Sequence, residues 1–299
     1  MTSVEGVVAV IHAVPIPPRS TRLLLAELRN RGVNAKYLPV QLLSLRLSSE
    51  GGQVTVGGRR LEVKGALLRG LGSYLTLEQF FVRIGILRYL EGEGVRFMNR
   101  VGPLLRTRNK LETLAALAKR GLRVPATLAT ESLRRLYCEA KAMKDVVLKP
   151  VMGSRGFGSV RVQDPDVAFQ IAKTLLSFNQ PPLLQEYVDK PSRDIRVFVI
   201  GEEVVASMYR YAKGSWKTNI AQGGTGTPLR NPCEEVREIA LKCLEALGLD
   251  YAGVDIAEGE DGFYVLEVNG SPDFEELSRV SGLNIARLLA EYFISLIKR

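Results

Sequence analysis

The chain has 299 residues, 46% hydrophobic and 24% charged, which is the composition of an ordinary globular protein. Its first apolar segment, residues 7–14, is too short to cross a membrane, lacks a basic leader and is followed by three prolines, so we expect a cytoplasmic protein. The single histidine, His12, lies within that segment, which excludes a Ser-His triad and a histidine base from the expected chemistry.

Charge is distributed unevenly along the chain. Residues 1–150 hold 25 Lys and Arg against 11 Asp and Glu, whereas residues 151–299 hold 16 against 21. A basic half facing an acidic half suits an anionic ligand held between cationic groups and a carboxylate-bound metal. Nucleic-acid binding is the alternative interpretation of the net charge of +9, but the sequence has few aromatic residues and no nucleic-acid motif.

The three cysteines, Cys138, Cys233 and Cys243, are odd in number and lack C-x-x-C spacing. A disulfide framework or a zinc site is therefore not expected.

The N-terminal third predicts a βαβ start without the G-x-G-x-x-G turn of dinucleotide-binding folds. A break at 98–103 suggests a domain boundary. The expected elements are a strand at 7–14, a helix at 21–30 capped by Ser20, a strand at 35–40, a hairpin at 53–63 turning at Gly57-Gly58, a strand at 65–71, and a helix from the capping box Thr76-Leu-Glu-Gln79 to about Leu90.

The middle of the chain places a glycine-rich loop, 153–158, between two strands. It cannot be a P-loop, which requires G-K-[ST] and a following helix. It could lay backbone N–H groups over phosphates, but a plain hairpin turn is an equal alternative. The expected elements are helices at 107–121, 131–142 and 166–178 and strands at 145–150, 159–162 and 183–188.

The last third contains the segment that carries most chemistry, a hairpin at 254–269. If its loop is odd in length, Asp255 lies opposite Glu267, and Asn269 shares that face. Two carboxylates and an amide are ligands that Mg²⁺ accepts, although a solvated hairpin face is the alternative. The other expected elements are strands at 193–200 and 204–211, a polar loop at 216–224, and helices at 231–247 and 283–298.

Together these motifs resemble the ATP-grasp superfamily, and within it the RimK-like α-L-glutamate ligases. The motifs, in order, are Lys110 in Arg-Asn-Lys-Leu, Lys149 in Val-Leu-Lys-Pro, the glycine loop, Gln185-Glu186-Tyr187-Val188, Arg193-Asp194-Ile195-Arg196, Lys217-Thr218-Asn219, Ala252-Gly253-Val254-Asp255 and Glu267-Val268-Asn269. The resemblance is dense over the last two hundred residues and looser over the N-terminal part, where it includes Arg69-Gly-Leu-Gly72.

The resemblance implies an α/β (α+β) ATP-grasp fold. Its parts would be an N-terminal pre-ATP-grasp βαβ domain at 1–98, a central lobe with the glycine-rich loop at 99–184, and a C-terminal lobe with the metal site at 185–299. The two lobes would enclose ATP.

The resemblance also implies roles for individual residues. Lys110, Lys149 and the loop residues Gly153, Ser154, Gly156 and Gly158 would contact the ATP phosphates. Gln185, Glu186 and Tyr187 would line the adenine pocket, and Asp194 would bind the ribose hydroxyls. Lys217, Thr218 and Asn219 would contact the phosphates and the reacting centre, and Arg196 and Arg210 would grip the carboxylate or acyl phosphate. Asp255, Glu267 and Asn269 would hold one or two Mg²⁺ (or Mn²⁺) ions.

The implied reaction is amide formation by an ATP-dependent carboxylate-amine ligase through an acyl phosphate, with L-glutamate or another amino acid as the amine and ADP and phosphate as products. The chain departs from the family after Asn269, where it reads Gly270-Ser-Pro-Asp-Phe274, so the acceptor stays open: a protein C-terminus, a carrier protein or a coenzyme tail. The alternatives are a carrier-protein ligase of the LysX type and a non-catalytic nucleotide-binding protein. The resemblance is also compatible with a homo-oligomer.

Overall fold

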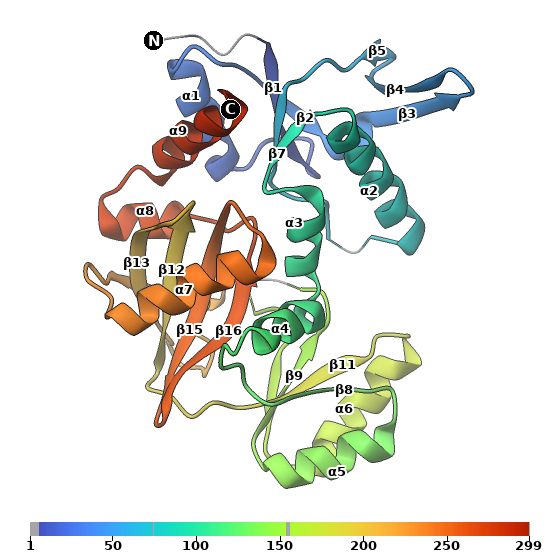
Figure 1. The fold of residues 1–299 in the computed structure, drawn as a ribbon. Coiled ribbons are helices and arrows are strands. Elements are labelled where there is room, and N and C mark those ends of the chain that lie inside the picture. Colours follow the sequence, from blue (N-terminus) through green and yellow to red (C-terminus); the bar gives the residue numbers. More distant parts are fainter. Residues whose placement is uncertain (1–5, 74, 154–155, 299) are drawn as a thin grey trace.

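The computed structural model describes residues 6–73, 75–153 and 156–298 and arranges them as three stacked layers (Figure 1). The first layer is a parallel sheet in the order β2-β1-β6-β7, as the predicted βαβ start requires. Its strands and helices are β1 (Val7–His12), β2 (Asn34–Pro39), β6 (Gly65–Leu68), β7 (Arg96–Met98), α1 (Arg19–Asn30) and α2 (Leu77–Gly92).

Helix α1 begins differently from the prediction. Ser20 is buried within the helix and does not cap it; Pro18 precedes the first turn. The backbone N–H of Ser20 instead donates to Glu275 Oε1 at 2.9 Å, a partner 255 residues away. By contrast, the capping box of α2 is confirmed, because Thr76 and Gln79 exchange both side-chain to backbone hydrogen bonds.

A small antiparallel sheet lies beside the first layer. The predicted turn at Gly57-Gly58 is confirmed, and both residues have positive φ angles. The prediction missed the strand before it, so the feature has three strands: β3 (Leu43–Ser48), β4 (Gly51–Val56) and β5 (Arg59–Arg60), preceded by the 3-10 turn η1 (Val40–Leu42).

The central lobe is an antiparallel sheet in the order β10-β9-β11-β8, covered by two helices. Its elements are β8 (Thr127–Ala129), α5 (Leu133–Met143), β9 (Val146–Pro150), β10 (Val160–Val162), α6 (Pro165–Ser177) and β11 (Pro182–Glu186). Two helices, α3 (Val101–Arg108) and α4 (Lys110–Lys119), connect this lobe to the first layer (Figure 1).

The C-terminal lobe is built on a five-stranded antiparallel sheet in the order β14-β13-β12-β15-β16. Its core packs α7 against one face of the sheet. The elements are β12 (Arg193–Ile200), β13 (Glu203–Tyr211), η2 (Ile220–Gln222), β14 (Thr225–Pro228), α7 (Glu234–Leu247), β15 (Tyr251–Gly259), β16 (Gly262–Asn269) and α8 (Glu275–Ser281). Strands β7, β8 and β14 and helices α3 and α8 are not predicted by the sequence pattern.

The hairpin of β15 and β16 reaches the predicted register by a different route. Its connecting turn is Glu260-Asp261, an even loop, which alone would set Asp255 opposite Leu266. A register shift between Asp255 and Ile256 makes Leu266 an extra residue, so that Asp255 pairs with Glu267. A β-bulge therefore delivers the face that an odd loop was expected to provide.

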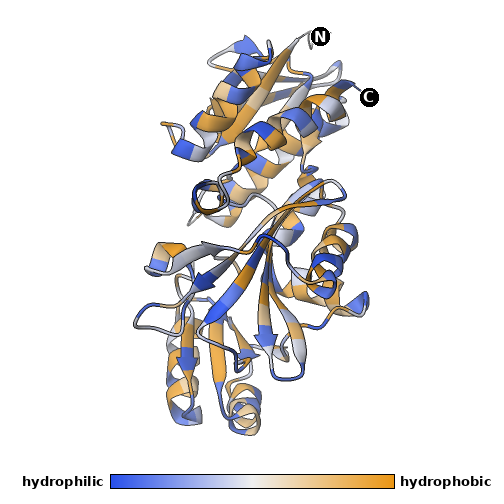
Figure 2. Cartoon of the chain, turned by 90° about the vertical axis from the view of Figure 1, so that its left-hand side faces the viewer, coloured by the Kyte–Doolittle hydropathy of each residue, from blue (hydrophilic) through white to orange (hydrophobic). Residues whose placement is uncertain are grey.

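The last helix, α9 (Ile285–Lys298), returns to the first layer and packs beside α1. A shared core joins this helix to both α1 and the five-stranded sheet. Hydrophobic residues gather along the strands and the covering helix faces of all three layers (Figure 2). The expected boundary at 184 falls inside β11, and we propose to place it in the loop 187–192 instead.

Within the described residues, no single helix is long and apolar enough to span a membrane. Helices α8 and α9 satisfy length and composition only as a pair bent by 113°.

Candidate active site

The predicted site residues lie on strands of the central and C-terminal lobes, at the start of α4, and in the loops that contain Gly156, Tyr187 and Lys217, where the two sheets approach each other (Figure 1). Lys149 is the next-to-last residue of β9, and its Nζ donates to Gln185 Oε1 on β11 at 2.5 Å. Because Lys149 pairs with Leu183, Gln185 is its diagonal neighbour on the same face. Gln185 is held in turn by Thr127 at 2.9 Å, a residue that the sequence analysis missed because β8 was not expected.

The pKa of Lys149 is lowered to about 8, mainly by burial, with nearby Lys110 adding to the shift and Glu267 opposing it. The side chain is therefore poised to gain a proton when an anion arrives.

We expect ATP binding near pH 9 to take up about one proton at Lys149, because the free amine is mostly neutral there and the phosphate-bound form is the ammonium. At pH 7 the uptake should be small, since the free amine is already protonated. Calorimetric titration in two buffers of different ionisation enthalpy measures it. Lys149→Arg keeps the cation but cannot titrate, so equal uptake in that variant would contradict the prediction.

The turn from α3 to α4 lies between the glycine loop and the β15–β16 hairpin. Asn109 caps α4 by accepting hydrogen bonds from the N–H groups of Leu111 and Glu112. The next residue, Lys110, donates to the carbonyl of Gly153 at 2.7 Å and lies 3.6 Å from Glu267 Oε1. Lys110 is thus placed between the loop and the hairpin, as its predicted phosphate role requires.

The glycine loop contacts the Lys217-Thr218-Asn219 segment. Lys217 Nζ donates to the carbonyl of Gly156 at 3.1 Å, and Gly156 and Gly158 have φ angles of +73° and +75°. A Cβ on Gly156 would overlap Oδ1 of Asn219. Ser154, predicted to contact phosphate, lies outside the described residues.

Gly156→Ala should weaken ATP binding about tenfold, equivalent to about 1.4 kcal/mol, because the loop must open to relieve both the backbone strain and the overlap with Asn219. Gly214→Ala is the control, since Gly214 has a φ of +65° but open space around its Cβ position. ATP titration of both variants separates strain from steric overlap. Equal losses of ATP affinity in the two variants would show that the overlap with Asn219 does not weaken ATP binding.

The predicted adenine wall is assembled around Tyr187. Its ring lies 3.5 Å from the guanidinium carbon of Arg161 and meets Trp216 edge-on at 6.1 Å. Asp145 holds Arg161 by hydrogen bonds of 2.6 to 3.2 Å. The N–H of Tyr187 bonds to the carbonyl of Asp145, so base recognition by that N–H would compete with a strand contact. The contribution of Glu186, whose side chain is exposed, stays a prediction.

Charged side chains form a row across one face of the five-stranded sheet. In the strand register, Arg210 on β13 lies directly opposite Asp194 on β12, and Arg196 on β12 lies opposite Asp255 on β15. Asp255 in turn lies opposite Glu267 on β16. Because strand alternation puts directly opposed residues on one face, the row follows from the register. It holds two guanidinium groups and three carboxylates.

The Arg210 end of this row is deeply buried. Arg210 grips both oxygens of Asp194 at 2.8 and 2.7 Å and lies 3.0 Å from Asp255, with 4% of its side chain exposed. Thr218 donates to Asp194 at 2.5 Å. Burial opposes ionisation of Asp194, but Arg210 and Thr218 outweigh it and hold the pKa below its usual value.

This burial bears on two predicted roles. Ribose hydroxyls would have to share the oxygens of Asp194 with Arg210 and Thr218, and a substrate carboxylate would have to share Arg210 with two aspartates. Both roles stay predictions. Arg196, with 13% of its side chain exposed, is the more accessible guanidinium of the row and bonds to Asp255 at 3.0 Å.

The predicted metal-ligand set is Asp255, Glu267 and Asn269, and its role stays a prediction. Among the described residues no group of three His, Cys, Asp or Glu side chains forms a metal cluster, and this set supplies two carboxylates and an amide. That donor chemistry fits Mg²⁺, which uses one or two carboxylates and fills its remaining positions with water and phosphate oxygens. Asp255 is 4% exposed and Glu267 21%, so Glu267 is the more accessible carboxylate.

Lys190 is a further cation that the sequence analysis missed, because it lies in a loop flanked by Asp189 and Pro191. Its Nζ donates to the carbonyl of Arg193 at 2.9 Å. Burial lowers its pKa, while Asp194 opposes the shift, which places this amine near the charged row.

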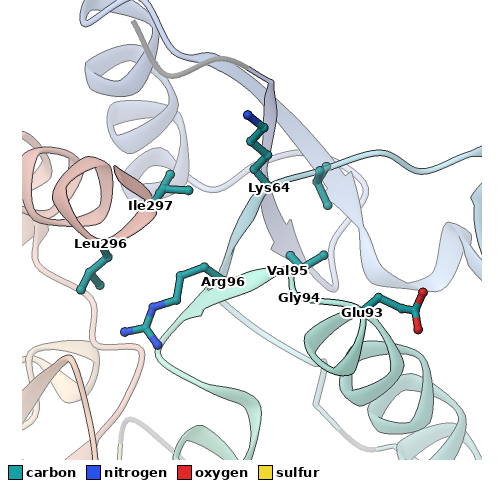
Figure 3. A pocket seen from close by; sticks show the side chains of 8 residues that line it. Lys64, Glu93, Gly94, Val95, Arg96, Leu296 and Ile297 are labelled. Carbon is teal, nitrogen blue, oxygen red and sulfur yellow. The ribbon is translucent and has the colours of Figure 1, made fainter. Parts of the chain in front are cut away.

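A cavity of about 490 Å³ lies elsewhere, between the residues that lead into β6, the residues that lead into β7, and the end of α9 (Figure 3). Lys64, Glu93 and Arg96 line it together with apolar residues, and it includes no residue of the charged row.

The chain is similar to several known proteins. Residues 107–293 match the RimK-like ATP-grasp domain. A tetrahydromethanopterin:alpha-L-glutamate ligase of Methanocaldococcus jannaschii is 39% identical over 225 residues, which is 73% of this chain and 76% of the relative. An alpha-aminoadipate–LysW ligase, LysX, of Sulfolobus acidocaldarius is 36% identical over 215 residues, 70% and 75% of the two chains. The solved structure of the ATP-grasp ligase PsnB with minimal precursor, Mg and ADP has a TM-score of 0.73, 20% identity and 98% coverage of both chains.

Proposed function

Because the chain belongs to the RimK-like ATP-grasp family, we propose that it joins L-glutamate to an acceptor carboxylate in an ATP-dependent reaction. Membership of this family confirms the ATP-grasp fold and the ligase class that the motifs predicted.

The observation that carries the proposal is the charged row with lysines around it. The row ends at the accessible carboxylate of Glu267. Lys149 on β9 and Lys110 on α4 both lie near this carboxylate. Cations near a metal-binding carboxylate suit the triphosphate of ATP, whose transferred group needs counter-charge in the transition state. A protein that only binds a nucleotide does not need both the phosphate-binding lysines and the metal-binding carboxylates.

The reaction has two steps. An oxygen of the acceptor carboxylate attacks the γ-phosphorus, the bond to the β-phosphate oxygen breaks, and ADP leaves an acyl phosphate behind. The amine of glutamate then attacks the acyl carbon, phosphate departs with the electrons of the C–O bond, and the amine proton passes to solvent. No side-chain nucleophile is needed, in keeping with a chain that contains one histidine.

Each group on the protein has a part in these steps. Lys149, Lys110 and Lys217 would bind phosphate oxygens, and Arg196 would orient the carboxylate being activated. Asp255, Glu267 and Asn269 would hold Mg²⁺ or Mn²⁺, which would supply positive charge at the transferred phosphoryl group. Catalysis then rests on orientation and electrostatics.

The acceptor we propose is a coenzyme-like small molecule with a terminal carboxylate, because a relative at 39% identity is named for tetrahydromethanopterin. A carrier protein with aminoadipate is the second candidate, supported by the relative at 36% identity that is named for LysW. Both relatives form a bond between an amine and a carboxylate by name, so the reaction class does not depend on this choice.

The test combines ATP either with L-glutamate and tetrahydromethanopterin or with aminoadipate and LysW, and measures ADP release and product mass. The proposal expects ADP release that needs both acceptor and glutamate, and a product heavier by one glutamyl residue. ADP release that needs aminoadipate and LysW would favour the second candidate. ATP binding without turnover in either mixture would contradict ligase activity on these acceptors.

A further inference from the structure

Hydrogen bonds join the first layer to the C-terminal lobe at the end of the β15–β16 hairpin, next to Asn269. Asn99 follows β7 and is fully buried. Its Nδ2 donates to the carbonyls of Tyr251 at 2.8 Å and Gly270 at 2.6 Å, and its Oδ1 accepts from the N–H groups of Asp250 at 2.5 Å and Tyr251 at 3.0 Å. An asparagine amide has two donor hydrogens and two acceptor lone pairs, and all four are used here.

The two backbone segments that Asn99 joins are the start of β15 and the end of β16. The last paired residues of the hairpin are Gly253 and Asn269, so beyond them the strands have no ladder hydrogen bonds to each other. Asn99 bonds to both sides of this opening and closes it as a further rung would. Asn269, a member of the metal-ligand set, is the residue directly before the bonded Gly270.

Gly270 itself is enclosed by the α3 segment. Its N–H donates to Thr107 Oγ1 at 3.3 Å, so both of its backbone polar groups are bound by residues from outside the lobe. A Cβ at this position would lie 2.8 Å from Thr107 Oγ1 and 2.9 Å from Leu104 Cδ1, which only glycine avoids. Immediately after Asn269, the backbone of Gly270 is therefore packed tightly against Thr107 and Leu104 of α3.

A second buried side chain, Arg69, holds the residues that follow Gly270. Arg69 follows β6, the strand beside β7, and donates to the carbonyl of Pro272 at 2.8 Å and to the hydroxyl of Tyr251 at 3.2 Å. Ser271 donates back to the carbonyl of Arg69 at 3.0 Å. The carboxyl ends of neighbouring parallel strands are where such sheets bind ligands, and here that edge holds the protein's own segment 270–272.

We propose that Asn99, supported by Arg69, is a positioning residue that fixes the ends of β15 and β16 and thereby sets Asn269 and Asp255 for metal binding. This rests on the proposed function only in the identity of the metal ligands. Groups that orient metal ligands from behind them change metal affinity by about ten- to a hundredfold when removed. The first layer is thus part of the metal site without contacting the metal.

The test compares Asn99→Ala with Arg96→Gln in the full chain. Arg96 bonds to Asp250 at 3.1 Å across the same junction, so its loss weakens the junction without releasing Gly270. Mn²⁺ affinity is measured by electron paramagnetic resonance in the presence of ADP, and backbone amide hydrogen exchange of residues 251–253 and 268–271 is measured without metal or nucleotide. Neither readout needs the acceptor, so a failed ligase assay leaves them interpretable.

For Asn99→Ala we expect Mn²⁺ affinity to fall about tenfold and exchange at both segments to accelerate, with metal-free ADP affinity within about twofold of the parent. Arg96→Gln should change neither. Should Asn99→Ala fail to fold, Thr107→Val removes the acceptor for the Gly270 N–H, together with a local bond to the Leu104 carbonyl, and should show the same changes more weakly. Unchanged Mn²⁺ affinity in the folded variant, or an equal fall in Arg96→Gln, would overturn the proposal.

Discussion

Glu267→Gln is expected to lower acyl phosphate formation by about a thousandfold, equivalent to about 4 kcal/mol in the activation free energy, while ATP still binds. The substitution removes the most accessible carboxylate of the metal-ligand set and the ion pair with Lys110 at 3.6 Å. It leaves the contacts of Lys149 with Gln185 and of Tyr187 with Arg161 and Trp216 in place. The acyl phosphate is trapped with hydroxylamine across a Mg²⁺ titration, using the acceptor identified by the screen above.

The matched control is Glu258→Gln on the same hairpin. Glu258 is 26% exposed and bonded to Arg193 at 2.9 Å, so it resembles Glu267 in burial and pairing but lies beyond the charged row. Its trapping rate should stay within about twofold of the parent, since a partly exposed pair contributes about 1 kcal/mol or less. Parent-like trapping in Glu267→Gln, at the parent's Mg²⁺ dependence, would show that the hairpin is not the metal site.

Asp194→Asn should destabilise the fold by about 3 to 5 kcal/mol, because it removes one of the two carboxylates that balance the charge of the buried Arg210 and leaves only Asp255. Adding Arg210→Met should recover part of the loss, since the second substitution removes that charge. Urea unfolding of the two single variants and the double variant gives the coupling free energy. Purely additive losses would contradict direct pairing.

The control pair for this cycle is Arg279 and Glu276 on α8. It has the same two-bond geometry, at 2.9 and 2.7 Å, but Arg279 is 66% exposed. Its coupling free energy should be about 1 kcal/mol or less.

The contribution of Asp194 to the free energy of unfolding depends on pH with a defined sign. Because the pKa of Asp194 is lowered in the folded protein, this contribution is complete above its unfolded pKa near 4 and is lost as the pH falls below that value.

The sequence predicted the hairpin face correctly because a strand's side chains alternate with a fixed period. It could not predict how the register arises, because the even turn at 260–261 and the bulge at Leu266 compensate each other. Periodicity also located Lys149 and its glycine loop, since a charged residue ending an apolar strand is conspicuous. The short strands β7, β8 and β14 lack enough residues for a period to be detected.

Contacts between distant segments could not be predicted from the sequence for a different reason. That Asp194 faces Arg210 depends on the pairing of two strands, and the charge alone was equally compatible with a ligand contact. Asn99 offered no signal, because its four bonds reach residues more than 150 positions away. Such side chains become recognisable only when the topology brings their partners to them.

The position of α9 has a consequence for synthesis on the ribosome. This helix, residues 285–298, shares a core with α1 near the other end of the chain. Domains generally fold in the order in which they emerge, but here the sheet that emerges first lacks one of its covering helices until the last part of the chain has been made. The central lobe has no such dependence, since its elements all lie between Thr127 and Glu186. The middle of the protein is therefore expected to fold to completion before its beginning.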